Sequence, residues 1–126
     1  ADSRWVHRVP YDWKAWEHRD DETTVAGILW NRICKLVGIR KSHPVFSVQN
    51  IEVPWEYNKH IFSFIKRSED ETVHVVVNFS EHRIQLDASV FNCFDEMPID
   101  LISGNTYPYG PLTVEPYQFF CFYQKK

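Results

Sequence analysis

The fold class of this chain is decided by two neighbouring stretches, Asp100-Leu101-Ile102-Ser103-Gly104-Asn105-Thr106-Tyr107 and Leu112-Thr113-Val114-Glu115-Pro116-Tyr117-Gln118-Phe119-Phe120. The first is typical of a strand that ends in a Gly-Asn turn. The second is typical of a short strand, a Pro-Tyr break and a final aromatic strand. Short strands that follow each other this closely predict antiparallel pairing.

A period of two in the apolar residues extends this pattern back to residue 60. Residues 60–66 and 73–79 are predicted strands, and the acidic turn at 68–71 joins them into a hairpin. Further short strands are predicted at 84–86, 91–94, 99–102, 112–114 and 119–123, and residues 47–53 could add one more. The sequence therefore predicts a mainly β fold, an antiparallel Greek-key β-sandwich preceded by a loop and one amphipathic helix.

The predicted helix spans residues 23–41, because apolar residues recur there at helical spacing. Acidic residues precede the segment, basic residues end it, and Pro44 prevents its continuation. Gly27 and Gly38 each cost about 1 kcal/mol relative to alanine inside a helix, and such glycines often permit close packing. The apolar stripe consists of Val25, Ile28, Leu29, Ile33 and Leu36. We expect this stripe to dock on another surface.

Composition and charge exclude several function classes. The chain has 126 residues, 44% of them hydrophobic and 16% aromatic, which suits one well-packed domain. Its net charge of −3 comes from interspersed acids and bases, which argues against a nucleic-acid surface. No apolar run is long enough for a membrane span.

Cysteines and histidines suggest no catalytic or metal site. Cys34, Cys93 and Cys121 lie far apart in apolar surroundings, so we expect buried free thiols in a reducing, cytoplasmic compartment, with a disulfide as the less favoured alternative. The six histidines lack metal-binding spacing, although His74 and His82 could approach each other across neighbouring strands. The acidic residues lie in turns, so we expect no glycosidase pair among them. No cofactor and no metal are predicted.

Four motifs together resemble one enzyme family. Residues 33–44, ICKLVGIRKSHP, are similar to a last barrel helix of the "KLIALRKxHP" kind, and residues 75–80, VVVNFS, are similar to a "VVxNFS" strand. With the "SGxxY" and "LxPYxFF" stretches already quoted, they follow the order of the α-amylase superfamily, glycoside hydrolase family 13. The resemblance implies that residues 1–44 are the end of a catalytic (β/α)8 barrel, a loop and its last helix. Residues 45–126 would be the C-terminal β-sandwich domain.

The lead-in resembles one branch of that family. Residues 2–8, DSRWVHR, are similar to the "DSRWxHR" segment of amylosucrase-type enzymes, which cleave sucrose and transfer the glucosyl unit with retention. The resemblance implies that Arg4 closes the glucose pocket by pairing with a barrel aspartate in the parent enzyme. Val9 and residues 53–57 depart from the pattern, which keeps hydrolase, phosphorylase and isomerase relatives open.

The expected function is therefore structural. A (β/α)8 barrel needs ~250 residues and carries the catalytic carboxylates, so we expect a non-catalytic C-terminal part of a glucan- or sucrose-active enzyme. The expected partner is the catalytic barrel of the parent, which would bind maltooligosaccharide or sucrose. One alternative is a carbohydrate-binding module that uses Trp55 and Tyr57 as a sugar platform, although aromatic packing is the favoured explanation of such residues. Another is an oligomerisation domain that self-associates through the helix at 23–41.

Overall fold

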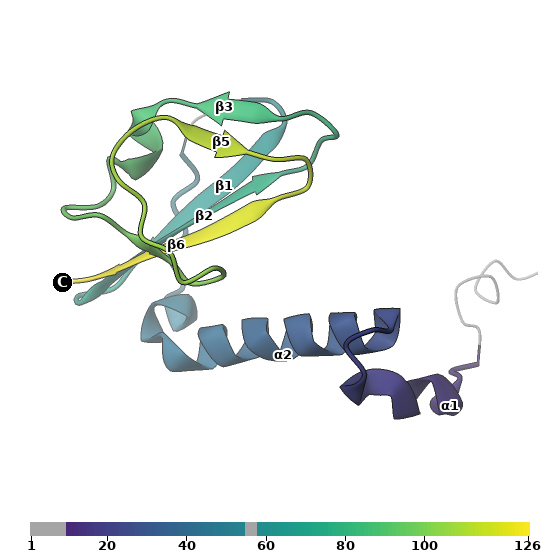
Figure 1. Ribbon diagram of the computed structural model, residues 1–126. Coiled ribbons are helices and arrows are strands. Elements are labelled where there is room, and N and C mark those ends of the chain that lie inside the picture. The colour runs from purple at the N-terminus through teal and green to yellow at the C-terminus, as the bar shows by residue number, and fades with distance from the viewer. Residues whose placement is uncertain (1–9, 55–57) are drawn as a thin grey trace, which may run out of the picture. The chain divides into compact units, whose positions relative to one another are not determined.

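The computed structural model describes residues 10–54 and 58–126. Its contacts divide the chain into two compact units, Ala1–Arg40 and Lys41–Lys126 (Figure 1). The first unit is helical, and the second contains all the strands of the described residues. No helix in the described ranges has the length and apolar character needed to cross a membrane.

From residue 10 onward, where the description begins, the first unit contains three helical segments. They are the α-helix α1, Trp13–Trp16, the 3-10 helix η2, Glu17–Asp20, and the α-helix α2, Val25–Ser42, which continues two residues into the second unit. Asp12 caps α1 by accepting a hydrogen bond from the Lys14 backbone N–H at 3.0 Å. The Thr24 hydroxyl oxygen accepts a hydrogen bond from the Gly27 N–H at 3.0 Å and so satisfies one free donor at the start of α2.

The predicted apolar stripe of α2 lies on the surface. Its exposed members are Val25, Ile28, Leu29, Ile33, Leu36 and Val37. Trp30 of the same helix packs edge-to-face on Trp16 with ring centroids 4.8 Å apart, and Leu29 and Ile33 of the stripe line a hollow with these two rings. Gly27 is buried because a Cβ there would overlap the carbonyl group of Asp21, whereas Gly38 has open space around it. Only one of the two glycines therefore serves close packing within the described residues.

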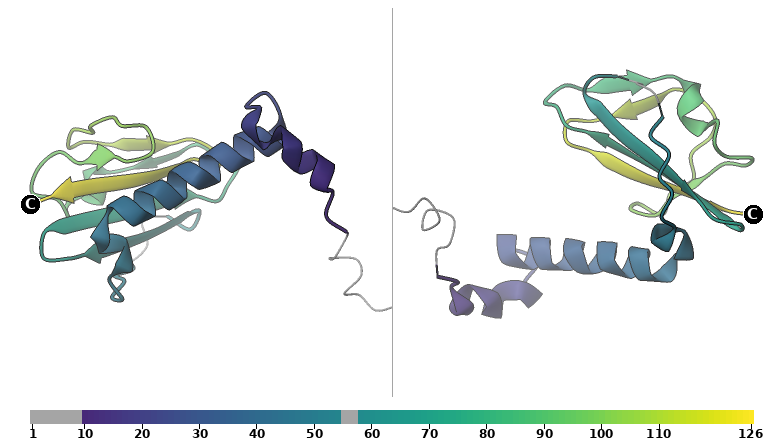
Figure 2. Two further views of the ribbon diagram at one scale, coloured as in Figure 1. Left: turned by 90° about the horizontal axis from the view of Figure 1, so that it is seen from below. Right: turned by 180° about the vertical axis from the view of Figure 1, so that it is seen from behind.

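The described residues of the second unit form six strands that pair antiparallel in two sheets. Figure 1 and Figure 2 show this unit from three sides. The larger sheet has the order β1-β2-β6-β4, and the smaller pairs β3 with β5. The bounds are β1 Ile61–Arg67, β2 Glu71–Asn78, β3 Ile84–Leu86, β4 Ile99–Asp100, β5 Leu112–Val114 and β6 Phe119–Lys125. This arrangement confirms the predicted class, a mainly antiparallel β-sandwich.

One strand prediction, at 91–94, was wrong, and the possible additional strand at 47–53 does not form. Residues 91–94 do not form a strand: the 3-10 helix η4, Ala88–Phe91, ends there, and Asp87 caps it by accepting from the Ser89 N–H at 2.8 Å. A short apolar run does not distinguish a buried strand from a buried helical turn. Residues 47–53 contribute only the isolated bridge Glu52–Ile65, because the chain first forms the 3-10 helix η3, Pro44–Ser47.

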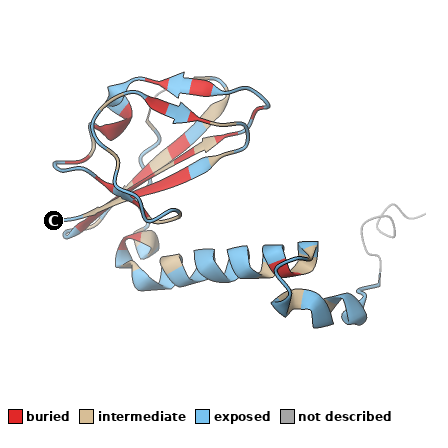
Figure 3. Ribbon diagram, viewed as in Figure 1, coloured by how far each residue is buried: buried red, intermediate tan, exposed pale blue. Residues whose placement is uncertain are grey.

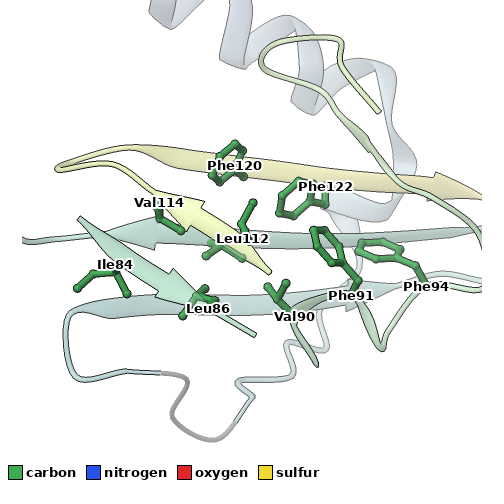
Figure 4. Close-up of a cluster of buried hydrophobic side chains, with 10 residues drawn as sticks. Ile84, Leu86, Val90, Phe91, Phe94, Leu112, Val114, Phe120 and Phe122 are labelled. Carbon is green, nitrogen blue, oxygen red and sulfur yellow. The ribbon is translucent and has the colours of Figure 1, made fainter. Parts of the chain in front are cut away.

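The main core lies between the two sheets. Figure 4 shows its side chains, which come from both sheets and from the turn that contains η4. Phe122 meets Phe91 edge-to-face and Phe120 face-to-face, each with ring centroids 5.1 Å apart. The cluster comprises Val76, Ile84, Leu86, Val90, Phe91, Phe94, Leu112, Val114, Phe120 and Phe122. In Figure 3 these buried positions alternate with more exposed ones along β3 and β5.

A second, smaller core lies on the outer face of the larger sheet. Val45 of η3 packs there with Val73 of β2 and Cys121 of β6. Residues 73, 75 and 77 point to this outer face, whereas Val76 between them points into the main core. Strand β2 is therefore largely buried on both of its faces, unlike a strand that has one face in water.

Candidate functional site

The residues predicted to touch sugar lie outside the described residues. Arg4 belongs to the first nine residues, and Trp55 and Tyr57 belong to the segment 55–57. The glucose-pocket role of Arg4 and the sugar-platform role of Trp55 and Tyr57 therefore stay predictions. Among the described residues, the second unit contains three clusters of hydrogen-bonded polar groups, centred on Glu71, Asn78 and Asp100, and the last two belong to sequence motifs.

The first cluster joins the segment after α2 to the larger sheet. The Val45 backbone N–H donates to Glu71 Oε2 at 2.8 Å, and the Tyr123 hydroxyl donates to Glu71 Oε1 at 2.8 Å. We call these three residues the Glu71 clasp. Burial, followed by the hydrogen bond to Glu71, raises the pKa of Tyr123 to about 12, so this hydroxyl remains a donor at neutral pH. Lys66 reinforces the attachment by donating from Nζ to the carbonyl oxygens of Phe46 and Val48.

A hollow of about 430 Å³ lies beside the clasp. Its lining consists of Ser42, His43, Pro44, Ser68, Glu69, Asp70, Glu71, Tyr123 and Lys125. Glu71 is buried and both of its carboxylate oxygens accept hydrogen bonds from the protein, whereas Glu69 and Asp70 are exposed in the turn. A glycosidase needs one carboxyl group as acid and another as base or nucleophile, all facing the sugar. The Glu71 carboxylate does not fit such a role, because both of its oxygens already accept hydrogen bonds from Val45 and Tyr123.

The second cluster explains the VVVNFS motif. Asn78 ends β2, and its side-chain Nδ2 lies within hydrogen-bond distance of the carbonyl oxygens of His82, Val114 and Glu115. Its Oδ1 accepts from both the backbone N–H and the hydroxyl of Ser80. One buried amide therefore ties the end of β2 to the turn before β3 and to the end of β5. The motif builds a corner of the sandwich.

The third cluster explains the DLISG motif. The buried Asp100 carboxylate accepts from the backbone N–H groups of Ile102, Ser103 and Cys121, and from the Ser103 hydroxyl at 2.7 Å. Gly104 follows at a φ of 79°, a left-handed conformation that glycine adopts without strain. Asp100 thus holds a tight turn against β6.

Cys93 and His74 form a cysteine–histidine contact that the sequence did not predict. Cys93 Sγ lies 3.7 Å from His74 Nδ1, which also contacts the Val90 carbonyl oxygen at 2.9 Å. Burial raises the pKa of Cys93 to about 11 and lowers the pKa of His74 to about 4. A nucleophilic cysteine needs the opposite shifts, a stabilised thiolate and a basic imidazole. This contact is therefore packing.

His74 and His82 have different ring partners, which agrees with the expectation of ordinary packing and surface histidines. His74 points into the core near Phe94, whereas His82 pairs with His60, with ring centroids 5.8 Å apart. In the described residues, no group of three His, Cys, Asp or Glu side chains could hold a metal ion. The thiols are free, but only Cys121 is buried and Cys34 is exposed on α2, which corrects the expectation of three buried cysteines.

The loop tyrosines divide between packing and surface. Tyr107 contacts the rings of Phe120 and Phe122, with centroids 5.4 and 5.3 Å apart, which is the packing that large aromatics favour. The Tyr109 hydroxyl donates to the Phe94 carbonyl oxygen, and one edge of its ring packs on Phe91. Tyr117 is exposed at a φ of 57° in the turn before β6. A sugar platform is therefore not assembled from these three rings.

Comparison with known proteins identifies the class to which this sandwich belongs. Residues 52–121, more than half of the chain, match the family model of the maltogenic amylase C-terminal domain. The chain belongs to this family and is a C-terminal domain of the α-amylase class of enzymes. The motifs resolved above, VVVNFS and DLISG, both lie inside the matched range.

Solved structures share the fold. AmyP, solved in complex with maltose, has a TM-score of 0.68 at 16% identity, and the match covers 78% of this chain and 20% of AmyP. Trehalulose synthase MutB from Pseudomonas mesoacidophila scores 0.55 at 24% identity, covering 73% and 17%. Trehalose-6-phosphate hydrolase TreA from Bacillus licheniformis scores 0.56 at 22% identity, covering 73% and 17%. The chain thus spans about a fifth of the length of these structures.

Proposed function

We propose that this chain is the non-catalytic C-terminal part of a retaining enzyme of amylosucrase type, which acts on sucrose and α-glucans. One observation supports the structural role. The buried polar side chains of Glu71, Asn78 and Asp100 form their hydrogen bonds with the protein's own turns and strands. A binding or catalytic site keeps polar groups available for a ligand. These three clusters instead shape the sandwich.

The domain division is part of this proposal. Residues 1–44 would complete the catalytic barrel, with the exposed stripe of α2 covering its sheet, and residues 45–126 would form the supporting domain. An exposed stripe of this size is unusual on a soluble monomer, which favours a covered position in the parent. The barrel of the same polypeptide is the proposed partner, with helix-mediated self-association as the alternative.

The substrate class rests on resemblance. Residues 2–8 match the amylosucrase-type pattern, and one solved structure of the similar MutB contains its substrate sucrose. AmyP was solved with maltose. Both sugars are α-glucosides. This shared chemistry supports a parent enzyme that cleaves an α-glucosidic bond.

Activity assays on two proteins test the proposal. The 126-residue chain should release neither fructose from sucrose nor glucose from maltotriose. The enzyme encoded by the complete reading frame should release fructose and lengthen an α-glucan, and NMR of the first product should show a retained α configuration. Turnover by the short chain would overturn the non-catalytic role. Free glucose without glucan growth would favour a hydrolase parent.

Arg4 offers a specific test within the parent enzyme. Arg4→Ala should lower kcat/KM for sucrose by about 100-fold or more, because a guanidinium paired with a carboxylate orients the glucose pocket. Arg19→Ala is the matched control, since Arg19 lies over the Trp16 ring in the first unit. An Arg4 variant with unchanged kinetics would contradict the amylosucrase-type assignment.

A further inference from the structure

Two histidines meet at the corner where the chain passes from the larger sheet to the smaller one. His60 directly precedes β1, and His82 lies in the turn between β2 and β3. Their ring centroids are 5.8 Å apart and the ring planes are inclined by 67°, so the rings are not stacked face to face. His82 is exposed and His60 is half-buried. We call these two residues the His60–His82 pair.

Hydrogen bonds hold the backbones of both histidines in place. The His60 carbonyl oxygen accepts from the Phe79 N–H at 2.9 Å. The His82 N–H donates to the Ser80 hydroxyl oxygen at 3.3 Å, and its carbonyl oxygen accepts from Asn78 Nδ2 at 2.7 Å. These bonds use the backbone of His82, and its imidazole lies outside them. Ligands that are fixed before binding lose little conformational freedom, which favours affinity.

The separation of the two rings fits a pair of imidazoles that share one ion. A Zn–N bond is about 2.0–2.1 Å long and the imidazole centre lies about 1.2 Å behind the ligating nitrogen, so each centre is about 3.2 Å from a bound ion. Two such centres are about 4.5 Å apart at a right angle about the ion and about 6.4 Å apart on opposite sides of it. The observed 5.8 Å lies inside this interval. Rotation about each Cβ–Cγ bond, a broad torsion, is the movement that turns a nitrogen toward the ion.

The charges beside the pair do not oppose a cation. Arg83, which follows His82, is paired with Glu115 at 3.0 Å, and this carboxylate offsets its charge. The two remaining charged neighbours in sequence, Lys59 and Glu81, are both exposed and opposite in sign. An ion can therefore approach the exposed ring of His82 from water.

The type of ligand atom selects the class of ion. Imidazole nitrogen suits Zn²⁺, Cu²⁺ and Ni²⁺, whereas Ca²⁺ and Mg²⁺ require oxygen ligands. Cu²⁺ should bind most tightly, because affinities of divalent first-row ions for a given nitrogen site peak at copper. Within the described ranges no group of three His, Cys, Asp or Glu side chains could hold an ion, so water would fill the remaining coordination positions.

We propose that His60 and His82 chelate one divalent transition-metal ion in a site of two imidazoles that is open to water. Once one ring holds the ion, the second binds it intramolecularly and therefore at a high effective concentration. The ion would connect the segment before β1 of the larger sheet to the turn before β3 of the smaller sheet. It would stabilise the sandwich, because the unfolded chain does not hold the two rings together. This inference is independent of the proposed function.

Calorimetric titration of the 126-residue chain with NiCl₂ tests the chelate. A Cys34→Ser background removes the exposed thiol, which would itself bind the metal. We expect one bound Ni²⁺ per chain. His60→Gln and His82→Gln should each weaken binding at least about tenfold, since even the outer partners of metal ligands contribute that much. His18→Gln changes an exposed histidine of the first unit and is the matched control with unchanged affinity. Far-UV circular dichroism checks that each variant is folded.

Two further measurements report on the site itself. The electron paramagnetic resonance spectrum of bound Cu²⁺ should show coupling to two imidazole nitrogens, and to one in either single variant. Ni²⁺ should raise the midpoint of thermal unfolding in the background protein but not in the His60→Gln/His82→Gln double variant. CaCl₂ at the same concentration should leave both midpoints unchanged.

Several results would overturn the inference. They are Ni²⁺ binding that survives in the double variant, a loss of affinity in only one of the two single variants, and no binding of Cu²⁺, Ni²⁺ or Zn²⁺ at millimolar concentrations. A dimer that forms only with metal in analytical ultracentrifugation would show that the ion bridges two chains, and this too would overturn an intramolecular chelate. The proposed function would stand in each case, because it is tested by the activity of the enzyme from the complete reading frame.

Discussion

Tyr123 of β6 donates a hydrogen bond to Glu71 of β2 at 2.8 Å, across two neighbouring strands. The second oxygen of the same carboxylate accepts from Val45, the residue that covers the small outer core. Glu71 is buried, and it therefore relies on these two donors in place of water. One carboxylate fixes the position at which the chain joins the sheet.

Removing the clasp should destabilise the sandwich. We expect Glu71→Ala to lower the free energy of unfolding by about 2–3 kcal/mol and Tyr123→Phe by about 1 kcal/mol, because hydrogen bonds to a charged group exceed neutral ones. The double variant should cost less than the two single changes together, since both remove the same bond. Urea unfolding followed by far-UV circular dichroism measures all three. Glu69→Ala, in the adjoining exposed turn, is the control and should cost less than about 0.5 kcal/mol.

His74 should make the sandwich sensitive to mild acid. Burial lowers its pKa to about 4, against a usual value of 6.5, with Arg67 adding a smaller effect in the same direction and the Val90 contact opposing it. Between these two values the unfolded chain binds a proton that the folded chain does not, so stability falls as pH is lowered from about 6.5 to 4. The full effect is about 3 kcal/mol.

Chemical denaturation at several pH values tests this dependence. His74→Gln should flatten the stability curve between pH 4 and 6.5, while His60→Gln, at a half-buried surface position, should preserve it. An unchanged slope in the His74 variant would show that other groups cause the acid sensitivity.

The two glycines of α2 should respond in opposite directions to the same substitution. Gly27→Ala places a Cβ against the Asp21 carbonyl group and should open the turn before the helix, lowering helicity. Gly38→Ala has open space and should raise helix stability by about 1 kcal/mol, the difference in propensity. Ellipticity at 222 nm during thermal unfolding distinguishes them. A loss of helicity in the Gly38 variant would reveal a neighbour at that position.

The three cysteines should react with thiol reagents at very different rates. Burial raises the pKa of Cys93 to about 11 and that of Cys121 to about 12, so few of these thiols ionise near pH 8. Cys34 is exposed on α2 and should be alkylated first. Mass spectrometry after iodoacetamide treatment should find one modification in the native chain and three in urea. Rapid labelling of Cys121 would contradict its burial on β6 beneath Val45 of η3.

The strands could be predicted from sequence wherever a run of alternating apolar residues lies between two polar turns. The hairpin of β1 and β2, the helix α2 and the final strand β6 all followed from such boundaries. The run at 91–94 could not be assigned in this way, because Phe91 and Phe94 are buried by a helical turn that Asp87 caps. Alternation in 73–79 also left open which face of β2 meets the main core. That choice depends on the sheet of β3 and β5, and β5 is distant from β2 in sequence.

The candidate site was less predictable. The motifs around Asn78 and Asp100 were recognisable as a family pattern, but their hydrogen bonds connect residues up to 37 positions apart. The clasp was missed because Glu71 reads as one more acid in a polar turn. The outer face of the larger sheet carried a signal that went unused: Phe62 and Phe64 pair with Val77 and Val75, on the face opposite the main core.

The position of η3 bears on how this domain can be produced and recombined. The family match begins at residue 52, yet Val45, Phe46 and the carbonyls that receive Lys66 all precede it. A gene fusion cut at residue 52 would strip the cover from Val73 and Cys121 and leave Glu71 without one donor. The transferable module therefore starts at or before Pro44, eight residues upstream of the recognisable homology, and chimeras between related enzymes should be spliced there.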